Sequence, residues 1–409
     1  MKLPFKIEEA IAREGGQLLT QEKELKLKDG AKTFNIGIPR ETGEDENRIS
    51  LTPESVMILV QNGHQVLLEA GAGNAAKFAD NEYSEAGARI IYSASELYEN
   101  SNIIVKVNPP TAEEIEQMQP QTVLISALQM SQMSADYIAC LNRRKIIGVA
   151  FELIEDEVGG LPIVRAMSEI AGSTVLLIAA EYLNSTNNGR GIILGGITGV
   201  PPTKVVILGA GTAAEFAART ALGLGAEVKV FDNQLYKLRR IRQELGHQIF
   251  TSVIDAANLT DALRRADVVI GALRAEEGRS PCVVTDEMVS FMKPNSVIVD
   301  VSIDQGGCFE TSKTTSHSKP VFKKYDVIHY CVPNIASRVA HTASNALSNI
   351  LTPILLKAHD LGGMEEMIFR KHWFMKGVYT YMGHLTGKHI AKMLNMRHKD
   401  IDLFRLSKF

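Results

Sequence analysis

A short glycine-rich segment carries the clearest chemical signal in this chain. It follows the apolar run 204–208, precedes a helical pattern over residues 215–222, and reads Gly209, Ala210, Gly211, Thr212, Ala213 and Ala214. The first glycine permits a tight turn, and the second lets the backbone approach a pyrophosphate. The small residue at 214 allows close helix–strand packing, and the helix N-terminus adds a positive dipole end. This arrangement predicts a dinucleotide-binding site.

Asp232 ends the next apolar run, residues 228–231. An acid about 20 residues beyond the glycines accepts hydrogen bonds from the adenosine ribose in such sites. Because a carboxylate repels a 2′-phosphate, Asp232 favours NAD over NADP. The alternative is a glycine-rich turn followed by a solvated aspartate. Lys237, one helical turn further, would contact the same ribose or lie on the plain surface.

The elements around this motif must hold it in place. Short apolar runs alternate with helical patterns, which is typical of parallel sheets covered on both faces. Strands are expected at residues 36–38, 66–68, 103–107, 123–126 and 147–153, and again at 205–208, 228–231, near Val268 and at 297–301. One helix should begin with Thr52 as N-cap and Pro53 at its first position. Further helices are expected over 168–183 and through 340–409.

Length and composition bound the class of protein. The 409 residues include 47 acidic and 44 basic side chains, and 45% of them are hydrophobic. A single core rarely exceeds ~250–300 residues, so two domains are expected. The net charge of −3 excludes a strong electrostatic attraction to nucleic acid or anionic membranes.

No targeting, membrane or metal signal is expected either. Mean hydropathy is −0.01, and the most apolar stretch, residues 174–183, is interrupted by Glu181. The N-terminus carries acids early and lacks the apolar region of a signal peptide. Four cysteines lie far apart, which argues against a disulfide framework and a structural zinc site and favours a reducing cytoplasm. They are Cys140, Cys282, Cys308 and Cys331.

Several further stretches resemble the family of alanine dehydrogenase and the nicotinamide nucleotide transhydrogenase α-subunit. The similar stretches are residues 37–42, Arg48 with Thr52-Pro53, residues 69–73, 167–172, 209–213 and 299–310. The last of these is the most specific, and the resemblance extends over about residues 34–394. It implies an α/β fold with two doubly wound parallel-sheet domains, in which a Rossmann NAD domain is inserted into a discontinuous substrate domain.

The resemblance also divides the chain. Residues 1–33 would be an N-terminal extension, with an amphipathic helix that serves as a packing arm or an oligomer contact. Residues 34–160 and 341–409 would form the substrate (catalytic) domain, and residues 161–340 the NAD-binding domain. The short connection after Asp232 resembles alanine dehydrogenase more than the transhydrogenases. Family members are commonly hexamers, so a homo-oligomer is expected by resemblance only.

An amino-acid dehydrogenase needs a cation for the substrate carboxylate and a group that moves a proton. Arg48 stands at the position of the family's carboxylate-binding arginine, whose planar fork suits a carboxylate. The alternative is a surface arginine on the acidic loop 44–46. Asp304 matches the family's acid near the nicotinamide and the substrate. Its alternative role is to cap the loop at Gly306-Gly307.

Two expected catalytic residues are replaced. The family's lysine and histidine correspond here to Asn108 and Gln129, which do not titrate but still hydrogen-bond a carbonyl or carboxylate. Lys106 remains in an apolar run, where an unpaired ammonium is costly, so it should have a partner. On a strand it would share a face with Asn108. Lys106 would form a structural salt bridge or take over a catalytic and substrate-binding role.

The remaining cofactor contacts come from the resemblance alone. Ser168, Leu273 and Asn334 stand at positions expected to lie near the cofactor. Four histidines fall on predicted helices without metal-type spacing and are expected to be surface or packed residues: His341, His372, His384 and His389.

Two functional hypotheses of different classes follow. The first is an NAD-dependent amino-acid dehydrogenase, which by resemblance converts L-alanine, NAD and water to pyruvate, ammonia and NADH by direct hydride transfer. The second is a transhydrogenase-α-like or regulatory NAD(H)-binding protein, which lacks deamination chemistry because of Asn108 and Gln129. A relative acting on a larger amino acid, as in the saccharopine-forming branch, explains the replacements no better. Either way the partners would be small molecules and the protein cytoplasmic.

Overall fold

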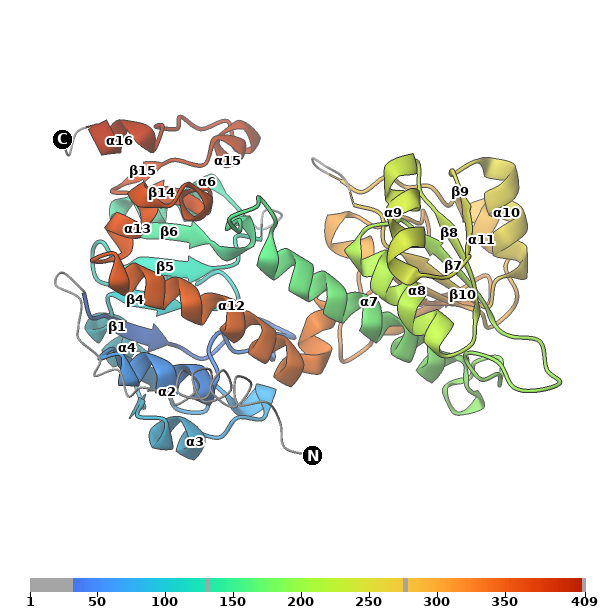
Figure 1. The fold of residues 1–409 in the computed structure, drawn as a ribbon, viewed down its shortest axis with the longest axis horizontal. Helices are drawn as coiled ribbons and strands as arrows, with labels where there is room; N and C mark the ends of the chain where they lie inside the picture. Colours follow the sequence, from blue (N-terminus) through green and yellow to red (C-terminus); the bar gives the residue numbers. More distant parts are fainter. Residues whose placement is uncertain (1–31, 130–132, 275–278, 407–409) are drawn as a thin grey trace, which may run out of the picture.

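The computed structural model describes residues 32–129, 133–274 and 279–406, and it arranges them as two α/β units. Each unit is built around its own sheet, and Figure 1 shows the two sheets side by side. Helix α7 (Pro162–Leu183) leads from the first unit into the second, and α12 (Ala340–Asp360) leads back. The expected fold class is therefore confirmed: both sheets are predominantly parallel, and the chain returns to the first sheet after completing the second.

Within the described residues the first sheet has eight strands in the order β15-β14-β6-β5-β4-β1-β2-β3. The parallel strands are β1 (Asn35–Ile38), β2 (Gln65–Glu69), β3 (Arg89–Ile91), β4 (Ile103–Val105), β5 (Val123–Ser126) and β6 (Ile147–Ala150). Strands β14 (Val378–Tyr381) and β15 (His384–Leu385) extend the sheet in antiparallel fashion from β6. The strand order reverses between β1 and β4, which is where doubly wound sheets bind ligands.

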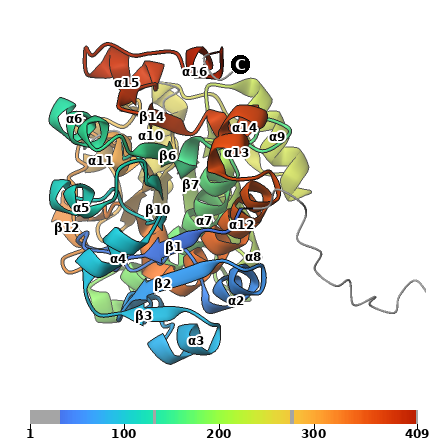
Figure 2. The same ribbon diagram turned by 90° about the vertical axis from the view of Figure 1, so that its left-hand side faces the viewer.

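Helices cover both faces of the first sheet, which explains its uninterrupted apolar strands. Figure 2 shows α4, α5 and α6 on one face and α2, α12 and α13 on the other. The bounds of the first unit's helices are α2 (Pro53–Gln61), α3 (Asp80–Glu85), α4 (Ala94–Asn100), α5 (Ala112–Gln117), α6 (Ala135–Arg143), α13 (Met364–Arg370), α14 (His372–Met375), α15 (Lys388–Met393) and α16 (Asp402–Leu406). Helix α2 begins as expected, with Thr52 at the N-cap and Pro53 in the first turn.

The second sheet repeats the same topology. Within the described residues it has seven strands in the order β12-β13-β11-β10-β7-β8-β9. They are β7 (Lys204–Leu208), β8 (Glu227–Phe231), β9 (Phe250–Ser252), β10 (Val268–Gly271), β11 (Val297–Asp300), β13 (Val327–Tyr330) and the antiparallel β12 (Val321–Lys324). Its helices are α8 (Thr212–Gly223), α9 (Leu235–Leu245), α10 (Ala256–Arg265) and α11 (Asp286–Ser290). The parallel strands follow the order of dinucleotide-binding folds, with the reversal between β7 and β10.

Helix α7 anchors the glycine-rich segment. Gly172 makes the close approach possible, because a Cβ there would lie 2.2 Å from the carbonyl oxygen of Ala213 in α8. Val175, Leu176 and Ala179 of α7 are buried in the same core as β7 and α8. Among the residues that the structure describes, α7 is the one helix long and apolar enough to cross a bilayer, by length and composition alone.

The structure corrects several expected boundaries. The strand expected over 103–107 ends at Val105, and the one expected over 147–153 ends at Ala150 and turns into a short 3₁₀ helix, Phe151–Leu153. The helix expected from residue 168 already begins at Pro162. The C-terminal part is not wholly helical, because it supplies β14 and β15, and His384 therefore lies on a strand. The amphipathic helix expected near the N-terminus lies outside the described residues.

Candidate functional site

Four residues singled out from the sequence lie on loops that leave one edge of the first sheet: Arg48, Lys106, Asn108 and Gln129. Parallel strands end at a common edge, so the loops that follow β1, β4, β5 and β6 meet there. The loop after β1 carries Glu41, Glu46 and Arg48. The loop after β4 carries Lys106 and Asn108.

Asn108 and Gln129 contact each other directly. Gln129 Nε2 donates a hydrogen bond of 2.7 Å to Asn108 Oδ1. Both residues are partly exposed, so a ligand can reach them. Gln129 adopts a left-handed backbone conformation, with φ of 45°, which few residues other than glycine and asparagine adopt readily. Asn108 and Gln129 therefore form one amide pair.

A glutamate holds the loop on which Asn108 lies. Glu41 accepts hydrogen bonds from the backbone N–H groups of Val107 (2.6 Å) and Asn108 (3.2 Å). Burial raises the pKa of Glu41 to about 7, although the nearby charge of Lys106 opposes this shift. Sequence reasoning missed Glu41 because its partners lie far away along the chain.

A second glutamate holds the loop on which Gln129 lies. Glu152 accepts a hydrogen bond of 2.7 Å from the backbone N–H of Leu128, and burial raises its pKa. Its other carboxyl oxygen is buried and has no hydrogen-bond partner among the described residues. Each member of the amide pair thus lies on a loop fixed by a carboxyl group that resists ionisation.

Lys106 is committed to an ion pair. Its Nζ lies 2.8 and 3.0 Å from the two carboxylate oxygens of Glu114, and its side chain is only 1% exposed. Glu114 also accepts a hydrogen bond from the Thr111 N–H and so caps α5. This geometry favours the structural salt bridge over a catalytic or substrate-binding role for Lys106. Because β4 ends at Val105, Lys106 and Asn108 do not share a strand face.

Arg48 is not a surface residue. Its side chain is 11% exposed and forms a two-point ion pair with Glu46, with Nε 2.7 Å from Oε1 and Nη2 2.6 Å from Oε2. Its Nη1 lies 3.4 Å from the sulfur of Met167 in α7. The carboxylate of Glu46 thus binds the edge of the guanidinium formed by Nε and Nη2. The edge formed by Nη1 and Nη2 remains for a second carboxylate.

Asp304 and Asn334 of the second unit join this cluster. Asn334 Nδ2 donates a hydrogen bond of 2.9 Å to Glu46 Oε2. The surrounding protein raises the pKa of Asp304, whereas the Asn334 N–H and the charge of Arg48 lower it. The Asp304 side chain nevertheless remains accessible to solvent. The cluster therefore combines a guanidinium and an accessible carboxyl from two different units.

The loop-capping role considered for Asp304 belongs to Asp300. Its buried carboxylate accepts hydrogen bonds from the Ser302 and Cys308 N–H groups (3.1 and 3.0 Å) and from the Ser312 hydroxyl (2.6 Å). It thereby shapes the turn that contains the two glycines after Asp304. Asp304 instead interacts with the backbone N–H of Asn334 and with the charge of Arg48.

The glycine-rich segment has the geometry that a pyrophosphate requires. Gly209 has φ of +110°, and a Cβ at this position would lie 2.4 Å from the carbonyl oxygen of Ala272. Gly211 differs, because no heavy atom of the described residues lies within 4 Å of its hypothetical Cβ. Helix α8 begins at the next residue, and no described side chain caps its N-terminus. Open space beside uncapped N–H groups fits an anion.

Asp232 lies at the adjoining strand end but is not solvated. It is 5% exposed, and its two oxygens accept hydrogen bonds from the N–H groups of Ala210 (2.8 Å) and Gln234 (2.7 Å). Each oxygen keeps a second lone pair for a ribose hydroxyl. Lys237 is partly exposed and lies near the ring of Tyr236. Sequence reasoning missed Arg240, which donates a hydrogen bond to the Ala210 carbonyl.

Two other expected cofactor contacts occupy defined places. The carbonyl of Leu273 accepts hydrogen bonds from the hydroxyls of Ser302 (2.6 Å) and Ser280 (3.1 Å), at the carboxyl end of β10. The Ser168 hydroxyl donates to the Val164 carbonyl one turn earlier in α7. Ser168 therefore lies beside Met167, which contacts Arg48, and not in the glycine-rich loop.

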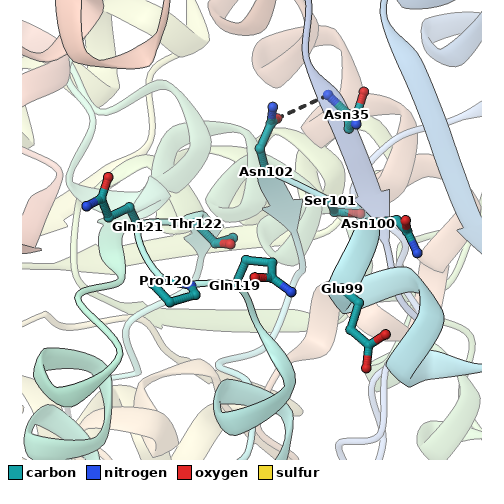
Figure 3. Close-up of a pocket in the computed structure, with 9 residues that line it drawn as sticks. All are labelled: Asn35, Glu99, Asn100, Ser101, Asn102, Gln119, Pro120, Gln121 and Thr122. Carbon is teal, nitrogen blue, oxygen red and sulfur yellow. Dashed lines mark hydrogen bonds between the residues drawn. The ribbon is translucent and has the colours of Figure 1, made fainter.

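Two depressions of the described surface lie away from this cluster. Figure 3 shows a polar one of about 250 Å³ at the amino ends of β1, β4 and β5, opposite the site. An apolar one of about 540 Å³ is lined by residues of α7, including Leu177, and by the segment 191–194. Within the described ranges no group of three or more histidine, cysteine or acidic side chains could hold a metal ion.

Comparison with known proteins gives consistent matches over most of the chain. The model of the N-terminal domain of alanine dehydrogenase/PNT matches residues 37–171, and that of the C-terminal domain matches residues 175–388. An alanine dehydrogenase of Mycolicibacterium smegmatis is 37% identical over 90% of this chain and 99% of its own length. One of Mycobacterium tuberculosis is 36% identical over 89% of this chain and 97% of its own.

Solved structures agree. An L-alanine dehydrogenase superposes with a TM-score of 0.83 at 34% identity, over 88% of this chain and 99% of that one. A transhydrogenase from Sinorhizobium meliloti superposes with a TM-score of 0.74 at 26% identity, over 87% of this chain and 99% of that one. The alanine dehydrogenase is the more similar of these two in both sequence and structure.

Proposed function

The chain belongs to the alanine dehydrogenase/PNT family, and on that premise we propose that it interconverts L-alanine and pyruvate with NAD as cofactor. The family resemblance expected from the sequence is confirmed, as is an oxidoreductase of the alanine dehydrogenase type. The observation that carries the proposal is the cluster of Arg48, Asn334 and Asp304, which joins the two units.

The second unit supplies the residues that would hold the cofactor. The open space at Gly211 and the N-terminus of α8 suit the pyrophosphate, and Asp232 suits a ribose without a 2′-phosphate. When bound, the nicotinamide gives or takes a hydride. Titration with NADH and NADPH tests the choice of cofactor, and tighter binding of NADPH would contradict it.

The first unit supplies the substrate contacts. The free edge of Arg48 would bind the substrate carboxylate, because two parallel N–H groups match its two oxygens. The outward amide groups of Asn108 and Gln129 would hydrogen-bond the carbonyl of the 2-oxo acid. Asp304 would hold or move the proton, since burial raises the pKa of its carboxyl and so favours the protonated form more than in water. Lys106 takes no part, because Glu114 engages it.

The assignment of residues to domains is part of the same proposal. Residues 34–160 and 341–409 would bind the substrate and residues 161–340 the cofactor. We further propose a cytoplasmic homo-oligomer, a hexamer by family resemblance. All four cysteines are unpaired, as a reducing compartment favours.

The test is direct. Purified protein is mixed with pyruvate, ammonium and NADH, and the loss of NADH absorbance is followed. Oxidation that depends on both pyruvate and ammonium supports the proposal. Absence of oxidation above background would end the alanine assignment.

A second candidate function rests on the amide pair. A protein that binds NAD(H) without deaminating amino acids, either transhydrogenase-α-like or regulatory, would have no need of a titrating lysine or histidine at positions 108 and 129. Because the two side chains are hydrogen-bonded, Asn108→Lys with Gln129→His would place the restored groups side by side. If the double variant oxidises alanine and the parent does not, this second function is favoured. A fully active parent excludes it.

A further inference from the structure

Glu46 has an unusually complete set of contacts. Its side chain has 0% exposure. Oε1 accepts hydrogen bonds from the backbone N–H and the Nε of Arg48, at 3.0 and 2.7 Å. Oε2 accepts from Arg48 Nη2 at 2.6 Å and from Asn334 Nδ2 at 2.9 Å. The four bonds use the four lone-pair positions of a carboxylate.

These bonds fix the orientation of Arg48. A guanidinium that shares Nε and one Nη with a carboxylate cannot rotate about its last bonds without breaking a charge-assisted pair. On the other edge, formed by the two Nη groups, Nη1 donates to the sulfur of Met167, a weak acceptor. A ligand carboxylate can therefore bind the second edge while Glu46 retains the first.

The same glutamate connects Arg48 to the second unit. Asn334 follows β13 and has φ of 57°, a backbone conformation that asparagine adopts readily. The neighbouring Asp45 also meets the second unit, because it accepts a hydrogen bond of 2.9 Å from the His317 N–H. Of these two loop residues, only Glu46 also binds the guanidinium of Arg48.

We propose that Glu46 is a positioning residue, through which Asn334 of the second unit sets the edge of Arg48 that binds the substrate carboxylate. This proposal rests on the proposed role of Arg48. Two effects oppose each other when the Glu46 charge is removed. Arg48 loses its fixed orientation, and this loss weakens binding of the substrate carboxylate. Arg48 also loses a negatively charged neighbour, and this second loss strengthens binding of the substrate carboxylate. We expect orientation to dominate, because charge-assisted hydrogen bonds are the stronger ones.

The experiment compares Glu46→Gln with Asp45→Asn as matched control. The dissociation constant of pyruvate is measured by calorimetry on the NADH-loaded protein. Glu46→Gln should weaken pyruvate binding about 10- to 100-fold, the loss expected for hydrogen bonds to a charged group. Asp45→Asn keeps an acceptor for His317 and should change it by less than about 3-fold. Unchanged or tighter pyruvate binding by Glu46→Gln would overturn the proposal.

A second variant tests the link to the other unit. Asn334→Gly removes the amide and keeps a left-handed backbone at no steric cost. Like Glu46→Gln, it should weaken pyruvate binding. The double variant Glu46→Gln with Asn334→Gly should bind pyruvate no more weakly than Glu46→Gln alone. Fully additive losses would mean that Asn334 does not act through Glu46. This variant also decides the matter if Glu46→Gln fails to fold.

The outcomes separate this proposal from the proposed function. If the parent binds pyruvate but does not oxidise NADH, the alanine assignment fails and the role of Glu46 stands. If the parent binds NADH but not pyruvate, the role of Glu46 fails. The dissociation constant of NADH should stay the same in Glu46→Gln and Asp45→Asn, because neither side chain is among the expected cofactor contacts.

Discussion

Charged side chains at the site are mostly committed to one another. Both cations near the amide pair have a carboxylate partner: Arg48 pairs with Glu46, and Lys106 pairs with Glu114. The carboxyls of Glu41, Glu152 and Asp304 are among the groups with raised pKa values. The described site residues thus combine cations that are already paired with carboxyls whose pKa values are raised.

Glu41 should make stability depend on pH. Its pKa is about 7 in the folded protein against 4.5 for an ordinary glutamate, so the folded state holds the proton more tightly. The resulting stabilisation is fully present below pH 4.5 and is lost as the pH rises through 7. Glu41→Gln removes this dependence. The free energy of unfolding of the variant minus that of the parent should therefore rise by up to about 3 kcal/mol from acid to alkaline pH.

Urea unfolding of the parent and of Glu41→Gln, at several pH values from acid to alkaline, measures this difference in the free energy of unfolding. The variant also loses one backbone hydrogen bond, which shifts all values equally. A difference between the two proteins that is independent of pH would contradict the raised pKa.

The Lys106–Glu114 pair should respond unequally to loss of either partner. Glu114→Gln leaves the buried ammonium without its ion-pair partner and should lower the free energy of unfolding by about 3 kcal/mol or more. Lys106→Met should cost less, because Glu114 is 13% exposed and can turn toward water. Lys106→Met should also retain its turnover number. Urea unfolding and steady-state kinetics measure these effects, and a Lys106→Met protein that folds but has lost turnover would restore the catalytic role.

The two glycines between β7 and α8 have different roles: Gly209 permits the turn, and Gly211 leaves space for a ligand. Gly209→Ala should destabilise the protein by about 1–3 kcal/mol or more, because a Cβ there strains a left-handed backbone and meets the Ala272 carbonyl. Gly211→Ala should change the free energy of unfolding by less than about 0.5 kcal/mol. It should nevertheless weaken NADH binding at least about 10-fold, because the methyl group fills the space for the pyrophosphate. Thermal unfolding and NADH titration distinguish the two, and equal NADH affinity in Gly211→Ala would argue against a pyrophosphate at this position.

Helices, strands and turns could be predicted from the sequence where they depend on residues close together in the chain. The glycine-rich turn, the Thr52-Pro53 helix start and the apolar strands all depend on neighbouring residues, and the structure contains them. The ends of β4 and the contacts of Glu41 and Glu46 could not be predicted, because their partners lie on other loops or in the other unit. Arg48 could be singled out by resemblance, but its pairing with Glu46 appears only once the loop is folded.

At the scale of the whole molecule, two units with the same order of parallel strands meet at one polar cluster. The first contributes Arg48 and Glu46, and the second contributes Asn334 and Asp304. Neither sheet alone brings an arginine to Asp304, so the site depends on the contact between the units.

Light scattering in solution should give a mass that is a multiple of the chain mass of 44.8 kDa, six-fold if the family resemblance extends to assembly. Exposed apolar side chains on the second unit supply a physical reason, among them Ile193 with 66% exposure. A mass of one chain at micromolar concentration would contradict a stable homo-oligomer.

The return of the chain to the first sheet has a consequence for synthesis. Strand β14 pairs with β6, and Thr380 Oγ1 accepts the Gly148 N–H, yet the whole second unit is made between them. At about 5–20 residues per second the growing chain spends roughly 10–45 s with the edge of β6 unpaired. An unpaired strand edge invites association with other chains. A nascent chain is therefore exposed to aggregation at an edge that the finished protein keeps paired.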